Sequence, residues 1–136
     1  MEHIPESMNF IQIEKHGDPD VLKLSSRSVP DPGLDEVLIR VEAAGVNRPD
    51  IMQRKGLYPP PPGATDVPGL EVSGTVVKTG KNVTKTGEGS QVCALVSCGG
   101  YAKYCLASAS ICLPVNLFGA FCRYSGNVLY CMDECF

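Results

Sequence analysis

Apolar and polar side chains alternate most regularly along residues 36–44. Successive side chains of an extended strand point to opposite faces, so a period of two indicates a strand with one buried face. The apolar positions on one face are Val37, Ile39, Val41 and Ala43. The positions on the other face are Leu38, Arg40 and Glu42. The pattern therefore predicts a β-strand whose first face packs against a core.

Shorter β-prone stretches lie on both sides of this strand. Residues 10–13 and 21–24 are predicted to form two strands, because residues 17–20 between them contain the glycine, aspartate and proline that favour a turn. Residues 28–33 contain two prolines and are predicted to form a loop. Further strands separated by glycine-containing turns are predicted at residues 72–77, 92–96, 101–106 and 111–113.

One short helix is predicted after the central strand. Pro49 suits the first turn of a helix, where its missing N–H is not needed, and Asn47 or Arg48 precedes it. The helix is expected to end at Gly56, before the rigid proline run at residues 59–62. Short, closely spaced strands with one minor helix predict a mostly β domain, built as a small barrel or sandwich.

The composition indicates a folded domain and argues against several classes of protein. The chain has 136 residues, enough for one domain with its own core. Hydrophobic residues make up 43% and charged residues 20%, which is typical of a folded domain and not of a disordered or membrane-spanning chain. The net charge of −3, without a block of like charges, argues against a nucleic-acid partner. No apolar run has membrane-spanning length and residues 1–7 do not resemble a signal peptide, so a cytoplasmic location is expected.

The cysteines favour free thiols over a structural metal site. Seven cysteines are present, an odd number, and all lie in the last third of the chain with irregular spacing. They are Cys93, Cys98, Cys105, Cys112, Cys122, Cys131 and Cys135. A reducing compartment keeps such thiols free, and the pair of C-x2-C units that is typical of structural zinc is absent.

Three stretches of the chain resemble one enzyme family. Residues 45–74 (GVNRPDIMQRKGLYPPPPGATDVPGLEVSG) are similar to the zinc-independent quinone oxidoreductases of the medium-chain dehydrogenase/reductase superfamily, especially to their p53-inducible branch. Residues 8–24 resemble the opening strands of the same family, and residues 91–104 resemble a later part of it. Together the resemblance covers residues 8–115, and its long middle motif makes it specific.

The resemblance implies a fold and a reaction. In this superfamily the N-terminal domain has a GroES-like β-barrel fold, a Rossmann domain follows and binds NADPH, and the active site lies in the cleft between them. The family transfers a hydride from NADPH to a quinone or another α,β-unsaturated carbonyl compound, so a quinone is the expected small-molecule partner. The protein positions the reactants, because the cofactor supplies the hydride.

The resemblance also implies that the protein binds no zinc. Zinc-dependent relatives place a cysteine at the position of Asn47 and a histidine at the position of Leu70. An amide and an aliphatic side chain supply no such ligand pair for Zn²⁺. The zinc enzymes also carry a four-cysteine loop after the strand that matches residues 91–96, whereas here that strand runs directly into residues 97–101.

Asn47 and Asp50 match the family's N-x-x-D motif at the cleft and are the candidate cofactor-binding residues. The resemblance implies that Asn47 faces the nicotinamide ribose or the substrate, while Asp50 supports the local geometry. Helix capping is the alternative for both residues, because Asn and Asp side chains satisfy free N–H groups at helix starts.

Tyr58 is the candidate catalytic residue, because it matches the tyrosine before the proline run in the p53-inducible branch. Its hydroxyl could donate a hydrogen bond to the substrate oxygen. The alternative is an aromatic ring that packs on the barrel with its hydroxyl in water. Glu71 remains from the Gly-His-Glu pattern of the zinc enzymes, and a structural role is expected for it.

The sequence offers no phosphate-binding loop of the Rossmann type. Gly87 and Gly89 are followed by Val92, where a G-x-G-x-x-G motif requires a third glycine. A Rossmann domain is therefore expected to be absent. NADPH, the cofactor of the full-length family, is expected to bind weakly or not at all to this chain.

Residues 116–136 depart from the family, which limits the expected GroES-like domain to residues 1–115. Shifting the reading frame forward by one base turns the junction of Met132 and Asp133 into a tryptophan codon, and the family carries Thr-Val-Trp where such a segment falls. We hypothesise that this tail is translated out of frame, which sequencing of the coding DNA decides. Its few charges and several aromatic residues also predict docking, fraying or self-association.

These observations predict the N-terminal fragment of an NADPH-dependent quinone oxidoreductase that does not catalyse the reaction by itself. Two alternatives stay open: a non-catalytic GroES-like binding or interaction module, and a nonfunctional truncated product. Titration with NADPH, size-exclusion chromatography and the cooperativity of thermal unfolding distinguish the three.

Overall fold

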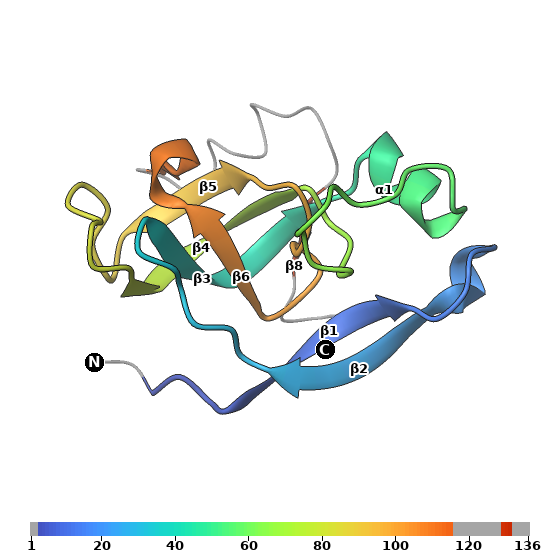
Figure 1. Ribbon diagram of the computed structural model, residues 1–136, viewed down its shortest axis with the longest axis horizontal. Coiled ribbons are helices and arrows are strands. Elements are labelled where there is room, and N and C mark those ends of the chain that lie inside the picture. The colour runs from blue at the N-terminus through green and yellow to red at the C-terminus, as the bar shows by residue number, and fades with distance from the viewer. Residues whose placement is uncertain (1–2, 116–128, 132–136) are drawn as a thin grey trace.

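The elements of the domain follow the order that the sequence pattern predicts. The computed structural model describes residues 3–115 and 129–131 (Figure 1). Its strands are β1 (Ser7–Ile13), β2 (Leu22–Ser28), β3 (Glu36–Gly45), β4 (Glu71–Thr79), β5 (Gln91–Leu95), β6 (Tyr104–Ser108), β7 (Leu113–Pro114) and β8 (Leu129–Cys131). Its helices are the 3-10 turn η1 (Pro19–Val21), α1 (Arg48–Arg54) and the 3-10 turn η2 (Ala109–Ile111). The prediction of a mostly β fold with a minor helix is confirmed.

The strands form two antiparallel sheets. β1 and β2 make a two-stranded sheet, the β1–β2 hairpin, which lies along one side of the larger sheet in Figure 1. The larger sheet has the order β6-β3-β4-β5-β7, and β8 also pairs with β3. A bridge between Phe10 and Ala102 joins the sheets, beside a 2.8 Å hydrogen bond from the Ile11 N–H to the Tyr101 carbonyl. Pairing among the described strands leaves both sheets open, so the predicted barrel is not confirmed.

β3 carries a bulge that changes which of its side chains face the core. Its register against β4 shifts between Val41 and Ala43, so Glu42 is an extra residue on β3. A bulge of this kind interrupts the alternation of faces along a strand. Ala44 is therefore in the core and is 2% exposed, whereas Ala43 is only half-buried. The prediction that Ala43 belongs to the buried face is wrong for this reason.

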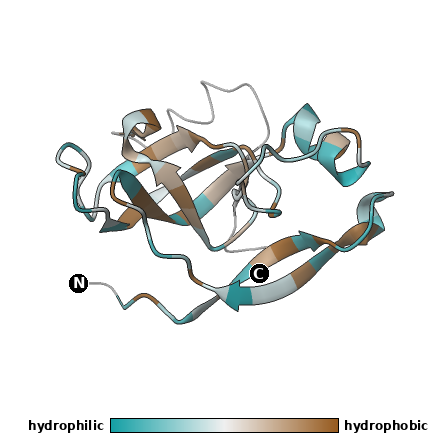
Figure 2. Cartoon of the chain, viewed as in Figure 1, coloured by the Kyte–Doolittle hydropathy of each residue, from teal (hydrophilic) through white to brown (hydrophobic). Residues whose placement is uncertain are grey.

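Two apolar clusters stabilise the domain. The larger one lies in the six-stranded sheet and contains Val37, Ile39, Val41, Ala44, Val72, Val76, Val92, Ala94, Val96, Cys105 and Ala107. The smaller one lies under the β1–β2 hairpin and contains Met8, Phe10, Val67 and Ala102. Figure 2 shows hydrophobic segments along the strands of both sheets. Tyr101 packs against both clusters, so it connects the hairpin to the main core.

Several predicted boundaries differ from the structure. The second strand continues to Ser28, and the strand expected at residues 101–106 begins only at Tyr104. The prediction of a strand at residues 111–113 is wrong for residues 111 and 112. The Cys112 N–H turns back to the Ala109 carbonyl at 3.4 Å and closes η2, so extended pairing starts at Leu113.

The hypotheses about the tail fall mostly outside the described residues. Residues 116–128 and 132–136 are not described, and these include the positions on which the reading-frame and self-association hypotheses rest. Among the helices that the structure does describe, none is long and apolar enough to cross a membrane.

Candidate functional site

Asn47 and Asp50, the two candidate cofactor-binding residues, meet where β3 ends and α1 begins. Asn47 occupies the N-cap position of α1, with an extended backbone (φ −117°). Its N–H donates to Asp50 Oδ2 at 2.8 Å, and the Asp50 N–H donates to the Asn47 carbonyl at 3.1 Å. Pro49 stands in the first turn, where no N–H is needed. The structure therefore shows Asp50 in the capping arrangement that was the alternative to a ligand contact.

A buried carboxylate fixes the side-chain amide of Asn47. Glu71 is the first residue of β4 and is 4% exposed. Its Oε2 accepts a 2.9 Å hydrogen bond from Asn47 Nδ2, which sets the orientation of the amide. Gly45 lies against the same carboxylate, and a Cβ at that position would collide with it. Asn47 is half-buried.

Tyr101 joins the site from a distant part of the sequence. Its hydroxyl donates to Asp50 Oδ2 at 3.0 Å, and the Gly45 carbonyl lies 3.3 Å from the same hydroxyl. We call Asn47, Asp50, Glu71 and Tyr101 the capping cluster. No local pattern marks Tyr101 in the sequence, because 51 residues separate it from Asp50. The family resemblance of residues 91–104 is the one signal that could have found it.

The capping cluster holds two neighbouring buried carboxylates. Burial raises the pKa of Asp50 above its ordinary value of 3.8, because desolvation disfavours the charged form. Hydrogen bonds from the Asn47 N–H and the Tyr101 hydroxyl lower this pKa, and the nearby charge of Glu71 raises it. Asp50 Oδ1 is buried without a hydrogen-bond partner among the described residues. The negative charge of the cluster is therefore only partly compensated by hydrogen-bond donors.

The substitution Asp50→Asn is expected to change how stability depends on pH. The pKa of Asp50 is higher in the folded chain than its ordinary 3.8, so the folded state binds this proton more tightly. The resulting stabilisation is present below about 3.8 and is lost as pH rises through the folded-state pKa. Urea unfolding at a series of pH values should show the unchanged chain losing free energy of unfolding relative to Asp50→Asn over that range. Parallel curves for the two proteins would contradict the assignment.

Tyr58 lies outside the hydrogen bonds of the capping cluster. It follows α1 in an irregular segment and is 43% exposed. Within the described residues its hydroxyl makes no hydrogen bond. Ile51 and Leu57, on and after α1, are also exposed, by 42% and 65%. The structure therefore brings Asn47 and Asp50 together but does not join Tyr58 to them.

Four cysteines whose side chains the structure describes are free thiols. They are Cys93, Cys98, Cys105 and Cys112. Burial raises the pKa of each, to about 12 for Cys105, so all four are protonated at neutral pH. Across the described part of the chain, no three His, Cys, Asp or Glu side chains gather as possible metal ligands.

The sequence is similar to curated quinone oxidoreductases. The quinone oxidoreductase of Lama guanicoe is 41% identical over 104 residues, which are 74% of this chain and 31% of that protein. The chain thus spans about a third of the length of such curated relatives.

Solved structures agree in fold. The human synaptic vesicle membrane protein VAT-1 homolog-like protein gives a TM-score of 0.77 at 30% identity, with 85% of this chain and 37% of that chain covered. The Escherichia coli quinone oxidoreductase complexed with NADPH gives 0.72 at 30% identity, with 79% and 33% covered. Residues 33–127 match the family model of the alcohol dehydrogenase GroES-like domain. The chain therefore belongs to the alcohol dehydrogenase GroES-like domain family, and its resemblance to the quinone oxidoreductases is confirmed.

Proposed function

We propose that this domain forms the substrate-facing wall of a quinone oxidoreductase that uses NADPH. The observation that carries the proposal is the Asn47 amide, which the buried Glu71 carboxylate holds in one orientation on a half-buried residue. An amide fixed in this way can hydrogen-bond a ribose hydroxyl or a carbonyl oxygen without first losing side-chain freedom. The relatives named quinone oxidoreductase, one of them complexed with NADPH, support this choice of substrate and cofactor.

The residues present fit one end of NADPH. Asn47 would contact the nicotinamide ribose or the substrate, and Asp50 and Tyr101 would hold the backbone of Asn47 in place. The described strand pairs are all antiparallel, so the described residues lack the parallel β-α-β unit that usually receives a dinucleotide pyrophosphate. The chain alone is accordingly expected to bind NADPH weakly or not at all. When bound, NADPH supplies the hydride.

We further propose that carbonyl activation in this protein needs no zinc. The donor chemistry supports this view, because Asn47 offers an amide that is already engaged by Glu71, and Leu70 offers an aliphatic chain. Hydrogen bonds to the substrate oxygen take over the polarising role. Tyr58 remains our candidate for one such donor, since its exposed hydroxyl can turn toward a substrate that arrives from the solvent side of α1.

A chimeric enzyme tests the proposed function. Residues 3–115 would replace the matching domain of the Escherichia coli quinone oxidoreductase, and NADPH oxidation would be followed with a para-quinone. The chimera is expected to reduce the quinone. Asn47→Ala should lower kcat/KM roughly tenfold, because one fixed hydrogen bond to a ligand is lost.

Asn82→Ala is the matched control, since Asn82 bonds Asp35 and is not part of the capping cluster. It should leave kcat/KM unchanged. A folded chimera that binds NADPH but fails to reduce the quinone would refute the proposed function. An Asn47→Ala chimera with full activity would refute the role of Asn47.

A further inference from the structure

A cavity of about 150 Å³ lies between the β1–β2 hairpin and the end of the larger sheet. Its walls come from β1, β2, the segment before β4, the segment before β6, and β6 itself. The inner wall includes Met8, Val67, Cys98, Ala102, Cys105 and Leu106. Asn47, Asp50 and Glu71 do not line it, so this cavity is separate from the candidate active site.

The wall of the cavity is mostly apolar, and Arg27 is the one charged side chain in its lining. Met8, Val67 and Ala102 are 7%, 2% and 1% exposed, and all three belong to the apolar cluster under the hairpin. Cys98 and Cys105 are 6% and 2% exposed, and burial raises the pKa of both thiols, so they remain neutral. A charged ligand would have to lose its hydration here without gaining a partner, which disfavours ions.

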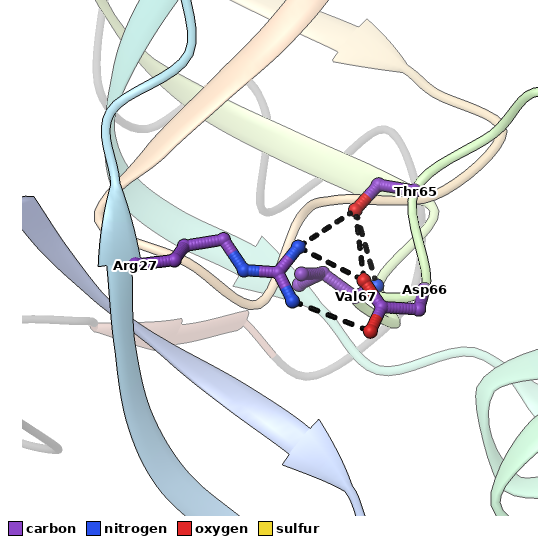
Figure 3. A network of polar contacts seen from close by, with 4 residues as sticks. All are labelled: Arg27, Thr65, Asp66 and Val67. Carbon is purple, nitrogen blue, oxygen red and sulfur yellow. Dashed lines mark hydrogen bonds and ion pairs between the residues drawn. The ribbon is translucent and has the colours of Figure 1, made fainter.

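An ion pair borders the cavity, because one of its two members, Arg27, lines the wall. Arg27 of β2 binds Asp66 at two points, with 2.9 Å from Nη1 to Oδ1 and 3.2 Å from Nη2 to Oδ2 (Figure 3). Nη1 also lies 3.4 Å from Thr65 Oγ1, and the guanidinium stacks 3.9 Å from the centre of the Phe10 ring. Arg27 and Thr65 line the cavity, whereas the side chain of Asp66 is 67% exposed.

This pair also neutralises the charge at the opening. The hydrogen bonds from Arg27 lower the pKa of Asp66, which keeps the carboxylate ionised at neutral pH. The guanidinium therefore already has its anion, and an anionic ligand gains little from it. The pair connects the hairpin to the segment before β4, so its opening would enlarge the entrance to the cavity.

We propose that the cavity is a second binding site, which takes a small uncharged molecule of about one aromatic ring. The size agrees with this class, because an engineered apolar cavity of about 150 Å³ in another protein binds benzene. The sulfur atoms of Met8, Cys98 and Cys105 in the wall offer the polarisable contacts that aromatic rings favour. The Arg27–Asp66 pair acts as the gate that controls entry.

Benzene is the probe for the first test, titrated into the full 136-residue chain with methyl NMR as the readout. Saturable shifts are expected at Met8, Val67, Ala102 and Leu106, with Kd on the order of millimolar for so small a ligand. Benzoate should cause no such shifts. The proposal fails if benzene gives no saturable shift, or if the shifts fall instead on Val83 and Val92 of the separate groove of about 770 Å³.

Two variants test the cavity and its gate. Ala102→Val fills part of the cavity and should weaken benzene binding about tenfold. Asp66→Asn should speed benzene exchange at least threefold and let benzoate bind, because it releases the Arg27 guanidinium. This second variant keeps the proposal testable if the buried substitution prevents folding.

The matched control is Asp31→Asn, which breaks the exposed Lys78–Asp31 pair, whose two residues do not line the cavity. It should change neither benzene exchange nor benzoate binding. Equal effects of Asp66→Asn and Asp31→Asn would overturn the gate.

Discussion

Replacing Gly69 with alanine is expected to lower the free energy of unfolding by about 3 kcal/mol or more. Gly69 has a φ of 101°, a conformation that residues with a side chain rarely adopt. An added Cβ would lie 2.6 Å from the Tyr101 nitrogen and 2.8 Å from the Gly100 Cα. Both are backbone atoms in a segment held by hydrogen bonds from Gly100 to Gly69 and from Tyr101 to Pro68, so neither can move easily.

Gly63→Ala is the matched control for this substitution. Gly63 has a φ of 82°, but nothing lies within 4 Å of an added Cβ. It should cost only the backbone strain of about 1 kcal/mol. Urea unfolding of both variants measures the difference, which isolates the collision with residues 100 and 101. Equal losses in the two variants would show that the packing at Gly69 is looser than described.

The substitution Ile39→Ala is expected to cost about 4 kcal/mol of unfolding free energy. Ile39 is 0% exposed and lies in the middle of β3, paired with Val76 on β4 and Cys105 on β6. Removing its side chain leaves a cavity where three strands meet, and the surrounding backbone cannot collapse without breaking strand pairing. A loss of this size is a large part of the stability of a domain, which is usually about 5–15 kcal/mol.

Leu95→Ala is the comparison for this core substitution. Leu95 also lies on a strand of the larger sheet but is 70% exposed. Its truncation should change the free energy of unfolding by less than about 0.5 kcal/mol. Urea unfolding followed by circular dichroism measures both variants. If Ile39→Ala proved as mild as Leu95→Ala, β3 would not be the centre of the core.

Local patterns were sufficient to predict most of the fold. The alternation along residues 36–44 predicts β3, because successive side chains of a strand point to opposite faces and the pattern is visible within the segment itself. Pro49 with Asn47 before it predicts the start of α1 for an equally local reason. The bulge at Glu42 was not predictable in this way, because it depends on the register against β4. Sheet closure also depends on pairing between distant segments, which no local pattern encodes.

The candidate site was predicted only in part. Asn47 and Asp50 belong to one short motif, and the structure places them in contact. The partners that hold them come from other elements: Glu71 begins β4 and Tyr101 precedes β6. Contacts between residues 24 and 51 positions apart are decided by the tertiary fold. Sequence analysis therefore predicted a structural role for Glu71 without its contact to Asn47, and it did not identify Tyr101 as a site residue.

The attachment of the β1–β2 hairpin has a consequence for the motions of the domain. Backbone hydrogen bonds connect Asn9 and Ile11 of β1 to the segment before β6, whereas β2 is paired only with β1 among the described strands. A two-stranded ribbon has little stability of its own, so it can detach while the larger sheet stays intact. The amide hydrogens of β2 are therefore expected to exchange with solvent through a local opening, at a lower free energy than those of β3 and β4.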